Sequence, residues 1–145
     1  MINLKNYEYL TEVKSLLAEC MMAGSDKIEQ ELLKYSEEDS RILFGRLINN
    51  ELVGLVGIIQ ISAAEVELKH IAVKSEFKNQ GIGRKMILEY LQNSRTVKMI
   101  AETDKDAVNF YRKIGFEITS LGEKYPGVER FKCILSVSQG ERNFT

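Results

Sequence analysis

Two glycines separated by one residue stand where a helix is expected to begin, in the stretch FKNQGIGRKMI. Glycine weakens the interior of a helix, so a pair at its start indicates a local structural need. The first turn of a helix leaves backbone N–H groups without partners and carries a partial positive charge. We therefore expect the N–H groups from Asn79 to Arg84 to form an anion site, with Lys78 adding positive charge. The alternative is a turn that only needs glycine for its backbone.

The spacing of the glycines excludes two common phosphate-binding motifs. The Walker A pattern G-x-x-x-x-G-K-[ST] is absent, and the dinucleotide pattern G-x-G-x-x-G is incomplete. The stretch by itself therefore leaves the anion site and the plain turn as open alternatives.

The composition indicates one domain without a nucleic-acid or membrane partner. The chain has 145 residues, 44% of them hydrophobic, and we expect a single domain over residues 1–137 followed by a polar tail over 138–145. The net charge of −1 provides no overall basic field for nucleic acid. No apolar run approaches the roughly 20 residues that span a bilayer, and the first residues do not have the order of a signal peptide. We therefore expect a cytoplasmic location.

The cysteines and the histidine do not suggest a metal site. Cys20 and Cys133 are far apart in the sequence, and the chain has one histidine. We expect both thiols to be free and buried, and no metal to be bound.

The spacing of apolar residues predicts a mixed α/β fold. The pattern gives a short opening strand, two helices, three strands, a helix, a strand, a helix and two strands.

Single residues indicate where some of these elements end. Ser25 or Asp26 is expected to cap the second helix, and Asn49 with Asn50 to form a hairpin turn. Gly115 is expected to end the last helix in the left-handed region. The order favours a mixed sheet with helices on both faces. The expected helices are 7–22, a segment from 25, a segment after 83 and 104–115. The main expected strands are 41–48, 52–61, 65–73, 97–103, 116–121 and 130–137.

The stretch ELKHIAVKSEFKNQGIGRKMI resembles the acyl-CoA-binding strand, loop and helix of the GNAT superfamily of N-acetyltransferases. In that family an apolar-Ala-Val strand end precedes [RQ]-x-x-G-x-[GA] and a helix. Gly81 and Gly83 match the two glycines of this pattern. Lys78 departs from it, because the family usually has Arg or Gln there.

A second stretch, AETDKDAVNFYRKIGFEI, is similar to the family's fifth strand and fourth helix, N-x-x-A-x-x-F-Y-x-[KR]-x-G-F. Ala107, Phe110, Tyr111 and Gly115 match this pattern. Asp104 departs from it, because it takes the place of Asn. An aspartate still caps a helix, but its charge is less favourable to a CoA phosphate.

The resemblance implies a GNAT fold: a mixed, mostly antiparallel sheet of six to seven strands with about four helices, splayed between strands 4 and 5. It also implies acetyl-CoA as co-substrate, with its pantetheine arm beside the fourth strand and its pyrophosphate on the glycine loop. The cofactor-binding residues so implied are Ile71, Ala72, Val73, Lys78, Asn79, Gln80, Gly81, Ile82, Gly83, Arg84, Asp104 and Phe110.

The resemblance also implies the residues that carry the reaction. Tyr111 matches the family's catalytic tyrosine and is the expected general acid at the sulfur, although a Phe-Tyr pair on a helix is commonly structural. Glu67 lies five residues before Ala72, the offset of the base in one branch of the family, and is the expected general base. Glu102 and a relay through water are the alternatives.

A bulge in the fourth strand is expected, by the resemblance, to free the backbone N–H of Ile71 or Ala72 for the thioester oxygen. Strand alternation groups His70 with Val66, Leu68 and Ala72, so we expect a core or sheet-face histidine without a catalytic role.

The acceptor is expected to be a primary amine of a small molecule or a peptide. By the resemblance, the walls of its site would come from residues 20–35 and 125–130. A module that binds acyl-CoA without turnover is the main alternative, because Lys78 and Asp104 depart from the family pattern. A domain that binds unrelated phosphates is a third possibility. A homodimer through an edge strand at 130–137 is also possible.

Overall fold

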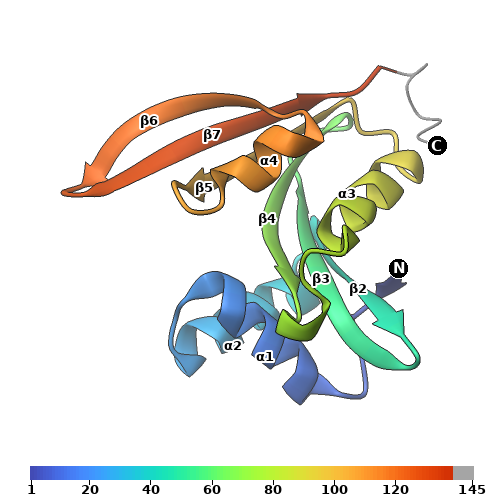
Figure 1. The fold of residues 1–145 in the computed structure, drawn as a ribbon. Coiled ribbons are helices and arrows are strands. Elements are labelled where there is room, and N and C mark those ends of the chain that lie inside the picture. The colour runs from blue at the N-terminus through green and yellow to red at the C-terminus, as the bar shows by residue number, and fades with distance from the viewer. Residues whose placement is uncertain (139–145) are drawn as a thin grey trace.

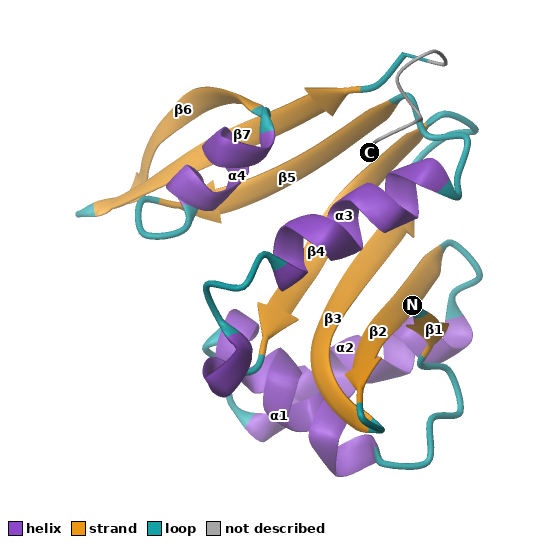
Figure 2. Ribbon diagram, turned by 45° about the vertical axis from the view of Figure 1, so that its right-hand side comes forward, coloured by secondary structure: helices purple, strands orange, loops and turns teal. Residues whose placement is uncertain are grey.

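A single mixed sheet with helices on both faces forms the molecule (Figures 1 and 2). The computed structural model describes residues 1–138, so the expected tail from 139 onward lies outside the described residues. The strand order is β1-β2-β3-β4-β5-β7-β6. The elements are β1 (Ile2–Asn3), α1 (Leu10–Met21), α2 (Ser25–Glu37), β2 (Arg41–Ile48), β3 (Glu51–Gln60), β4 (Glu65–Val73), the 3₁₀ turn η1 (Ser75–Phe77), α3 (Ile82–Gln92), β5 (Lys98–Asp104), α4 (Val108–Ile114), β6 (Glu117–Tyr125) and β7 (Val128–Ser136).

The sheet topology confirms the predicted fold class. Every pair of neighbouring strands in the described chain is antiparallel except β4 and β5, which run parallel. Helices α1 and α2 cover one face of the sheet, and α3 and α4 lie on the other (Figure 2).

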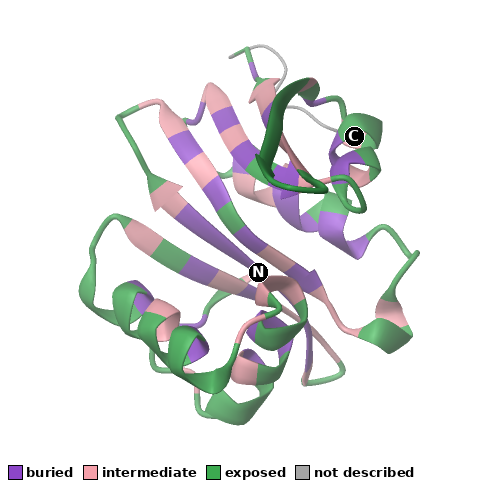
Figure 3. Cartoon of the chain, turned by 90° about the vertical axis from the view of Figure 1, so that its left-hand side faces the viewer, coloured by how far each residue is buried: buried purple, intermediate pink, exposed green. Residues whose placement is uncertain are grey.

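Two apolar clusters fill the space between the sheet and its helices. Met86, Ile87 and Leu91 of α3 are fully buried against one face of the sheet. Val13 and Leu17 of α1 are buried against the other face. Strand β3 lies between the two clusters, and it is buried along most of its length because both faces are covered (Figure 3).

The predictions for local turns are partly confirmed. Asn49 and Asn50 connect β2 to β3 with φ angles of 50° and 64°, as expected for a two-residue hairpin turn. Gly115 ends α4 with φ 115°. The prediction that Ser25 or Asp26 caps α2 is wrong, because Gly24 is the N-cap residue and makes no side-chain cap.

A long hairpin formed by β6 and β7, which we call the arm, extends away from the body of the molecule (Figure 1). Its strands are longer than predicted, since only Pro126 and Gly127 separate them. The prediction that residues 130–137 form a sheet edge is wrong, because β7 lies between β5 and β6. The edge strand is β6, whose residues are nearly all exposed.

Candidate active site

A slot opens in the sheet where β4 and β5 part. The two strands pair at three positions in the described chain, from Glu65 with Lys98 to Glu67 with Ile100. Beyond these pairs, β4 continues to Val73 and β5 to Asp104 without pairing to each other. This confirms the predicted splay between strands 4 and 5.

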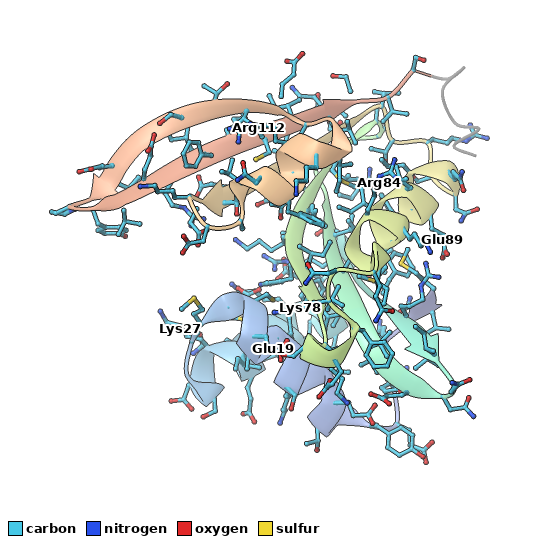
Figure 4. All side chains as sticks on the ribbon, in the orientation of Figure 1. Glu19, Lys27, Lys78, Arg84, Glu89 and Arg112 are labelled. Atoms are coloured by element: carbon cyan, nitrogen blue, oxygen red, sulfur yellow. The ribbon has the colours of Figure 1, made fainter. Side chains whose placement is uncertain are left out.

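A groove with a volume of about 680 Å³ lies along the open edge of β4 and the start of α3. It is lined by ten of the twelve residues expected to bind the cofactor; the exceptions are Gln80 and Asp104. The expected residues that line it are Ile71, Ala72, Val73, Lys78, Asn79, Gly81, Ile82, Gly83, Arg84 and Phe110. Figure 4 shows Lys78 on the loop before α3 and Arg84 in its first turn.

The two glycines of the loop, Gly81 and Gly83, are needed for different structural reasons: one for its backbone conformation and one for close packing. Gly81 has φ 79°, and no described heavy atom lies within 4 Å of the position that a Cβ would take. Gly81 therefore provides both a left-handed backbone and open space at the helix start. A Cβ on Gly83 would lie 3.0 Å from Cε1 of Phe110, so this glycine allows α3 to pack closely on α4. Asn79 is also left-handed, with φ 63°.

Asp104 organises the turn before α4. Its Oδ1 accepts hydrogen bonds from the backbone N–H groups of Asp106, at 3.0 Å, and Ala107, at 2.9 Å. This turn delays the helix, which begins at Val108 and not at the predicted residue 104. The expectation that Asp104 caps this helix is wrong, because the N-cap residue is Ala107 and no side chain caps the helix. Asp104 itself lines a neighbouring cavity and not the groove.

That second cavity has a volume of about 1310 Å³, and we call it the acceptor cavity. It lies between the α1–α2 connection, the open edge of β4 and the end of β5. Glu19, Lys27 and Lys78, from three separate segments, line it (Figure 4). From the expected hairpin wall, Arg130 contributes and Tyr125 does not.

Tyr111 on α4 lines both the groove and the acceptor cavity. The residue is 6% exposed, and its ring packs edge-on against Phe110 and Phe116 at centroid distances of 5.1 and 5.3 Å. Burial raises the pKa of the Tyr111 hydroxyl, which therefore stays protonated at neutral pH. The expected general acid thus lies at the junction of the two spaces.

The carboxylates considered as bases lie in different surroundings. Glu67 on β4 is the last residue that pairs with β5, and it is not among the residues that line the acceptor cavity. Glu102 lines the cavity but accepts hydrogen bonds from Lys124, at 3.0 Å, and Arg130, at 3.3 Å. The bond from Lys124, with the second from Arg130, lowers the pKa of Glu102. Glu102 is consequently a weaker proton acceptor than a free carboxylate.

A bulge at Lys69 changes which face β4 presents to each layer. In the register, Gly57 of β3 pairs with His70 and Ile58 pairs with Leu68, so Lys69 is the extra residue. Leu68 is buried on the α3 side, whereas Ala72 is buried on the α1 and α2 side. The predicted grouping of His70 with Leu68 is therefore wrong, because simple alternation does not continue through a bulge.

The open edge of β4 next to this bulge lies close to Cys20 of α1. Burial raises the pKa of the Cys20 thiol to about 11, and the nearby backbone of Cys20 and Ile71 opposes this shift. The thiol itself donates to the carbonyl of Leu17 at 3.4 Å. Cys20 and Cys133 are both free thiols; Cys133 is buried, as expected, whereas Cys20 is only partly buried.

The sequence reasoning missed a buried contact beneath the acceptor cavity. The hydroxyl of Tyr35 on α2 lies 2.6 Å from Nδ1 of His70, and both residues are buried. A Cβ on Gly57 would lie 1.8 Å from this hydroxyl, so the glycine makes room for it. The signal for this contact was a glycine within an apolar strand, which commonly marks a close approach.

Within residues 1–138, no cluster of three or more His, Cys, Asp or Glu side chains has an arrangement suited to a metal ion. No helix in the same part of the chain has the length and apolar character needed to cross a membrane.

Comparisons with known proteins agree with this geometry. The pattern of the Acetyltransferase (GNAT) family matches residues 10–116. The N-alpha-acetyltransferase RimI of Mycobacterium tuberculosis is 34% identical over 80 residues, which cover 51% of this chain and 51% of RimI. The chain spans about half the length of the curated relatives it matches.

Two solved structures show the same fold. A GNAT acetyltransferase from Elizabethkingia anophelis with acetyl-CoA bound has a TM-score of 0.65 and 23% identity, over 85% of this chain and 89% of that one. An aminoglycoside 6'-N-acetyltransferase complexed with coenzyme A has a TM-score of 0.76 and 19% identity, over 94% of this chain and 97% of that one. With the family pattern matching most of its length, the chain belongs to the GNAT acetyltransferase family.

Proposed function

We propose that this protein is an acetyl-CoA-dependent N-acetyltransferase that acts on a primary amine of a small molecule or peptide. The transfer is proposed to occur by direct attack of the amine while both substrates are bound. The observation that supports this most is the position of Tyr111, which lines the groove and the acceptor cavity at their junction. A protonated hydroxyl at that point serves a reaction between two molecules that enter from opposite sides.

The groove fits the chemistry of a CoA molecule. Helix α3 makes no side-chain cap at its start within the described residues, so its first N–H donors are available to a pyrophosphate. Gly81 leaves open space there, and Lys78 and Arg84 line the same groove. The unpaired edge of β4 from Ile71 to Val73 suits the amides of a pantetheine arm, as an added strand would.

The residues at the junction suit proton transfer. When bound, acetyl-CoA supplies an acetyl thioester whose sulfur departs as a thiol with a pKa of roughly 8.5. We assign to Tyr111 the proton that this sulfur receives, because burial keeps the hydroxyl protonated. The backbone N–H of Ile71 is the proposed donor to the thioester oxygen.

The acceptor amine must lose a proton, since a primary amine with a pKa of roughly 10 is mostly charged at neutral pH. Glu102 lines the acceptor cavity but is held in ion pairs with Lys124 and Arg130. Glu67 lies outside the residues that line the cavity, so it would act through water. Both carboxylates and a relay through water stay as predictions for the base.

The two acceptor classes in the proposal are supported by relatives of different kinds. RimI is named as an N-alpha-acetyltransferase, and the structural neighbour is an aminoglycoside 6'-N-acetyltransferase. The acceptor cavity, of about 1310 Å³, has room for either class.

The direct test measures release of free thiol from acetyl-CoA with a panel of amino acid amides, peptides, polyamines and aminoglycosides. We expect Tyr111→Phe to lower kcat by about 100-fold, within the usual range for losing a general acid. Tyr90→Phe is the matched control, since Tyr90 packs against Phe44 away from both cavities and should leave the rate unchanged. Tight binding of CoA without turnover of any amine would support the alternative of a silent acyl-CoA module.

A further inference from the structure

The contact between Tyr35 and His70 joins three elements beneath the acceptor cavity. Tyr35 comes from α2, His70 from β4 and Gly57, which makes room for the tyrosine hydroxyl, from β3. The Tyr35 ring is also held by Arg41, whose guanidinium lies 5.8 Å from the ring centroid. Arg41 in turn forms a 3.0 Å ion pair with Glu31. Because Tyr35 is fixed on several sides, the imidazole that it contacts has a defined orientation.

The contact between the two side chains bears on the tautomer of His70. The Tyr35 oxygen and Nδ1 of His70 are 2.6 Å apart, which is a hydrogen-bond distance. A neutral imidazole accepts at one ring nitrogen and donates at the other. We assign the Tyr35 hydroxyl as the donor to Nδ1, which puts the hydrogen of the ring on Nε2.

His70 forms part of the wall of the acceptor cavity. It is one of the residues that line this cavity, and it is 8% exposed. Its other ring nitrogen, Nε2, therefore belongs to a side chain at the boundary between the core and the acceptor side.

The ring is neutral near pH 7, because burial lowers the pKa of His70 to about 4. The charged groups that act on it come from three elements. Glu31 of α2 favours the charged ring, whereas Lys69 of β4 and Arg41 of β2 oppose it. The wall of the acceptor cavity thus includes a neutral imidazole that is held at Nδ1 by Tyr35.

We propose that His70 is a specificity residue whose Nε2–H donates a hydrogen bond to an oxygen atom near the acceptor amine, and that Tyr35 is its positioning residue. The substrates favoured by this bond are amines with a carbonyl or carboxylate oxygen a few bonds away, such as the α-amines of amino acids and peptides. Alkyl polyamines have no such oxygen. This inference rests on the proposed function, because it narrows the acceptor class of the same site.

The spacing along β4 supports this assignment. His70 precedes Ile71, which lines both the groove and the acceptor cavity and so marks where the reacting groups meet. Neighbouring strand residues are about 3.3 Å apart, which is similar to the separation between an α-amine and the oxygen of its own carbonyl group. An amine beside Ile71 would therefore have its own carbonyl oxygen about one residue away along β4, the spacing between Ile71 and His70.

The test compares two amines of similar size, alaninamide and sec-butylamine, of which only the first has a carbonyl. The ratio of their kcat/KM values is measured for the wild type, His70→Leu, His70→Gln and Tyr35→Phe. We expect His70→Leu to reduce the preference for alaninamide by roughly three- to tenfold, the usual effect of one neutral hydrogen bond. His70→Gln keeps an N–H donor and should retain much of the preference, and Tyr35→Phe should lose part of it. Tyr90→Phe is the control.

The outcomes separate this inference from the proposed function. An active wild type whose preference is unchanged in His70→Leu overturns the inference alone, as does a wild type that acetylates sec-butylamine but not alaninamide. A wild type that acetylates no amine of the panel above overturns the proposed function and this inference with it, whereas one that acetylates only amines without a nearby oxygen overturns this inference alone.

A second measurement does not depend on activity. His70 is the only histidine in the chain, so the ¹⁵N spectrum of histidine-labelled protein reports its tautomer directly. We expect a neutral ring at pH 7 with the hydrogen on Nε2, and a mixture of tautomers in Tyr35→Phe. A wild-type ring with its hydrogen on Nδ1 would overturn the assignment, since Nε2 would then have no hydrogen to donate.

Discussion

At the scale of single residues, Gly57 shows how one missing side chain shapes the acceptor side of the molecule. The Tyr35 hydroxyl occupies the space that a Cβ at Gly57 would fill, at 1.8 Å from that position. Gly54 in the same strand is less constrained, because its nearest neighbour is the flexible end of Met86 at 2.9 Å. The two glycines therefore differ in how far their surroundings can adjust.

We expect Gly57→Ala to lower the free energy of unfolding by about 3 kcal/mol, because the buried tyrosine has to move. Gly54→Ala, the matched control, should cost about 1 kcal/mol, since a methionine adjusts more easily. Urea unfolding measures both values. In a Tyr35→Phe background the cost of Gly57→Ala should fall, because the closest atom has been removed. Equal costs in the two backgrounds would show that the hydroxyl is not the obstacle.

At the scale of elements, the loop before α3 combines an unusual backbone with open space. Gly81 has φ 79°, and Gly127 at the tip of the arm has a closely similar φ of 77°. A Cβ at either position would have no described heavy atom within 4 Å. The difference is that Gly81 lines the groove and Gly127 lies in the turn between β6 and β7.

This pair makes a controlled test of the proposed pyrophosphate site. We expect Gly81→Glu to weaken CoA binding by well over tenfold, which exceeds about 1.4 kcal/mol. Gly127→Glu introduces the same charge and a similar backbone strain, and should leave the affinity unchanged. Isothermal titration calorimetry gives both dissociation constants. Unchanged affinity in a folded Gly81→Glu protein would contradict the site.

The elements were largely predictable from the sequence, whereas their irregularities were not. The spacing of apolar residues predicts α1, α3 and most strands, because the buried face of a helix or strand repeats at a fixed interval along the sequence. The bulge at Lys69 was implied only by the family resemblance, because an extra residue leaves no mark on a strand pattern. That is why the face of His70 was predicted wrongly. The position of β7 inside the sheet depends on a long-range pairing with β5, which local patterns do not encode.

At the scale of the whole molecule, His70 links stability to pH. Its pKa is about 4 in the folded protein and about 6.5 ordinarily. As the pH falls, the unfolded chain binds a proton at His70 before the folded protein does, and this favours unfolding. The free energy of unfolding that depends on a neutral His70 is therefore fully present above about pH 6.5 and is lost as the pH falls towards 4. For these pKa values the loss at pH 5 is about 2 kcal/mol.

We expect the wild type to lose about 2 kcal/mol more than His70→Gln between pH 7.5 and pH 5, measured by urea unfolding. Both proteins have the same carboxylates, so the difference between their losses of unfolding free energy comes from the histidine. If both proteins lose the same free energy, the imidazole is not held neutral by burial.

The candidate site is predictable only where short motifs define it. Two local patterns predict the cofactor-binding residues, and ten of these residues line one groove. Their role in binding the cofactor stays a prediction. The walls of the acceptor cavity come from α1, α2, β4, β5 and the arm, which only the tertiary fold brings together, so local patterns do not predict them and only the resemblance indicated part of them. The base and the homodimer stay predictions for the same reason, and any pairing of a second copy would have to use β6 as the edge.

The three pairs between β4 and β5 have a mechanical consequence. The sheet consists of two parts, β1 to β4 and β5 to β7, which are hydrogen-bonded to each other only at one end of the β4–β5 pair. Helix α3 lies in the chain segment that connects β4 to β5. Bending about the hydrogen-bonded end costs less than bending elsewhere, because few backbone hydrogen bonds resist it. A molecule lying between the two parts would bridge them, so the stiffness of the protein would depend on whether the slot is filled.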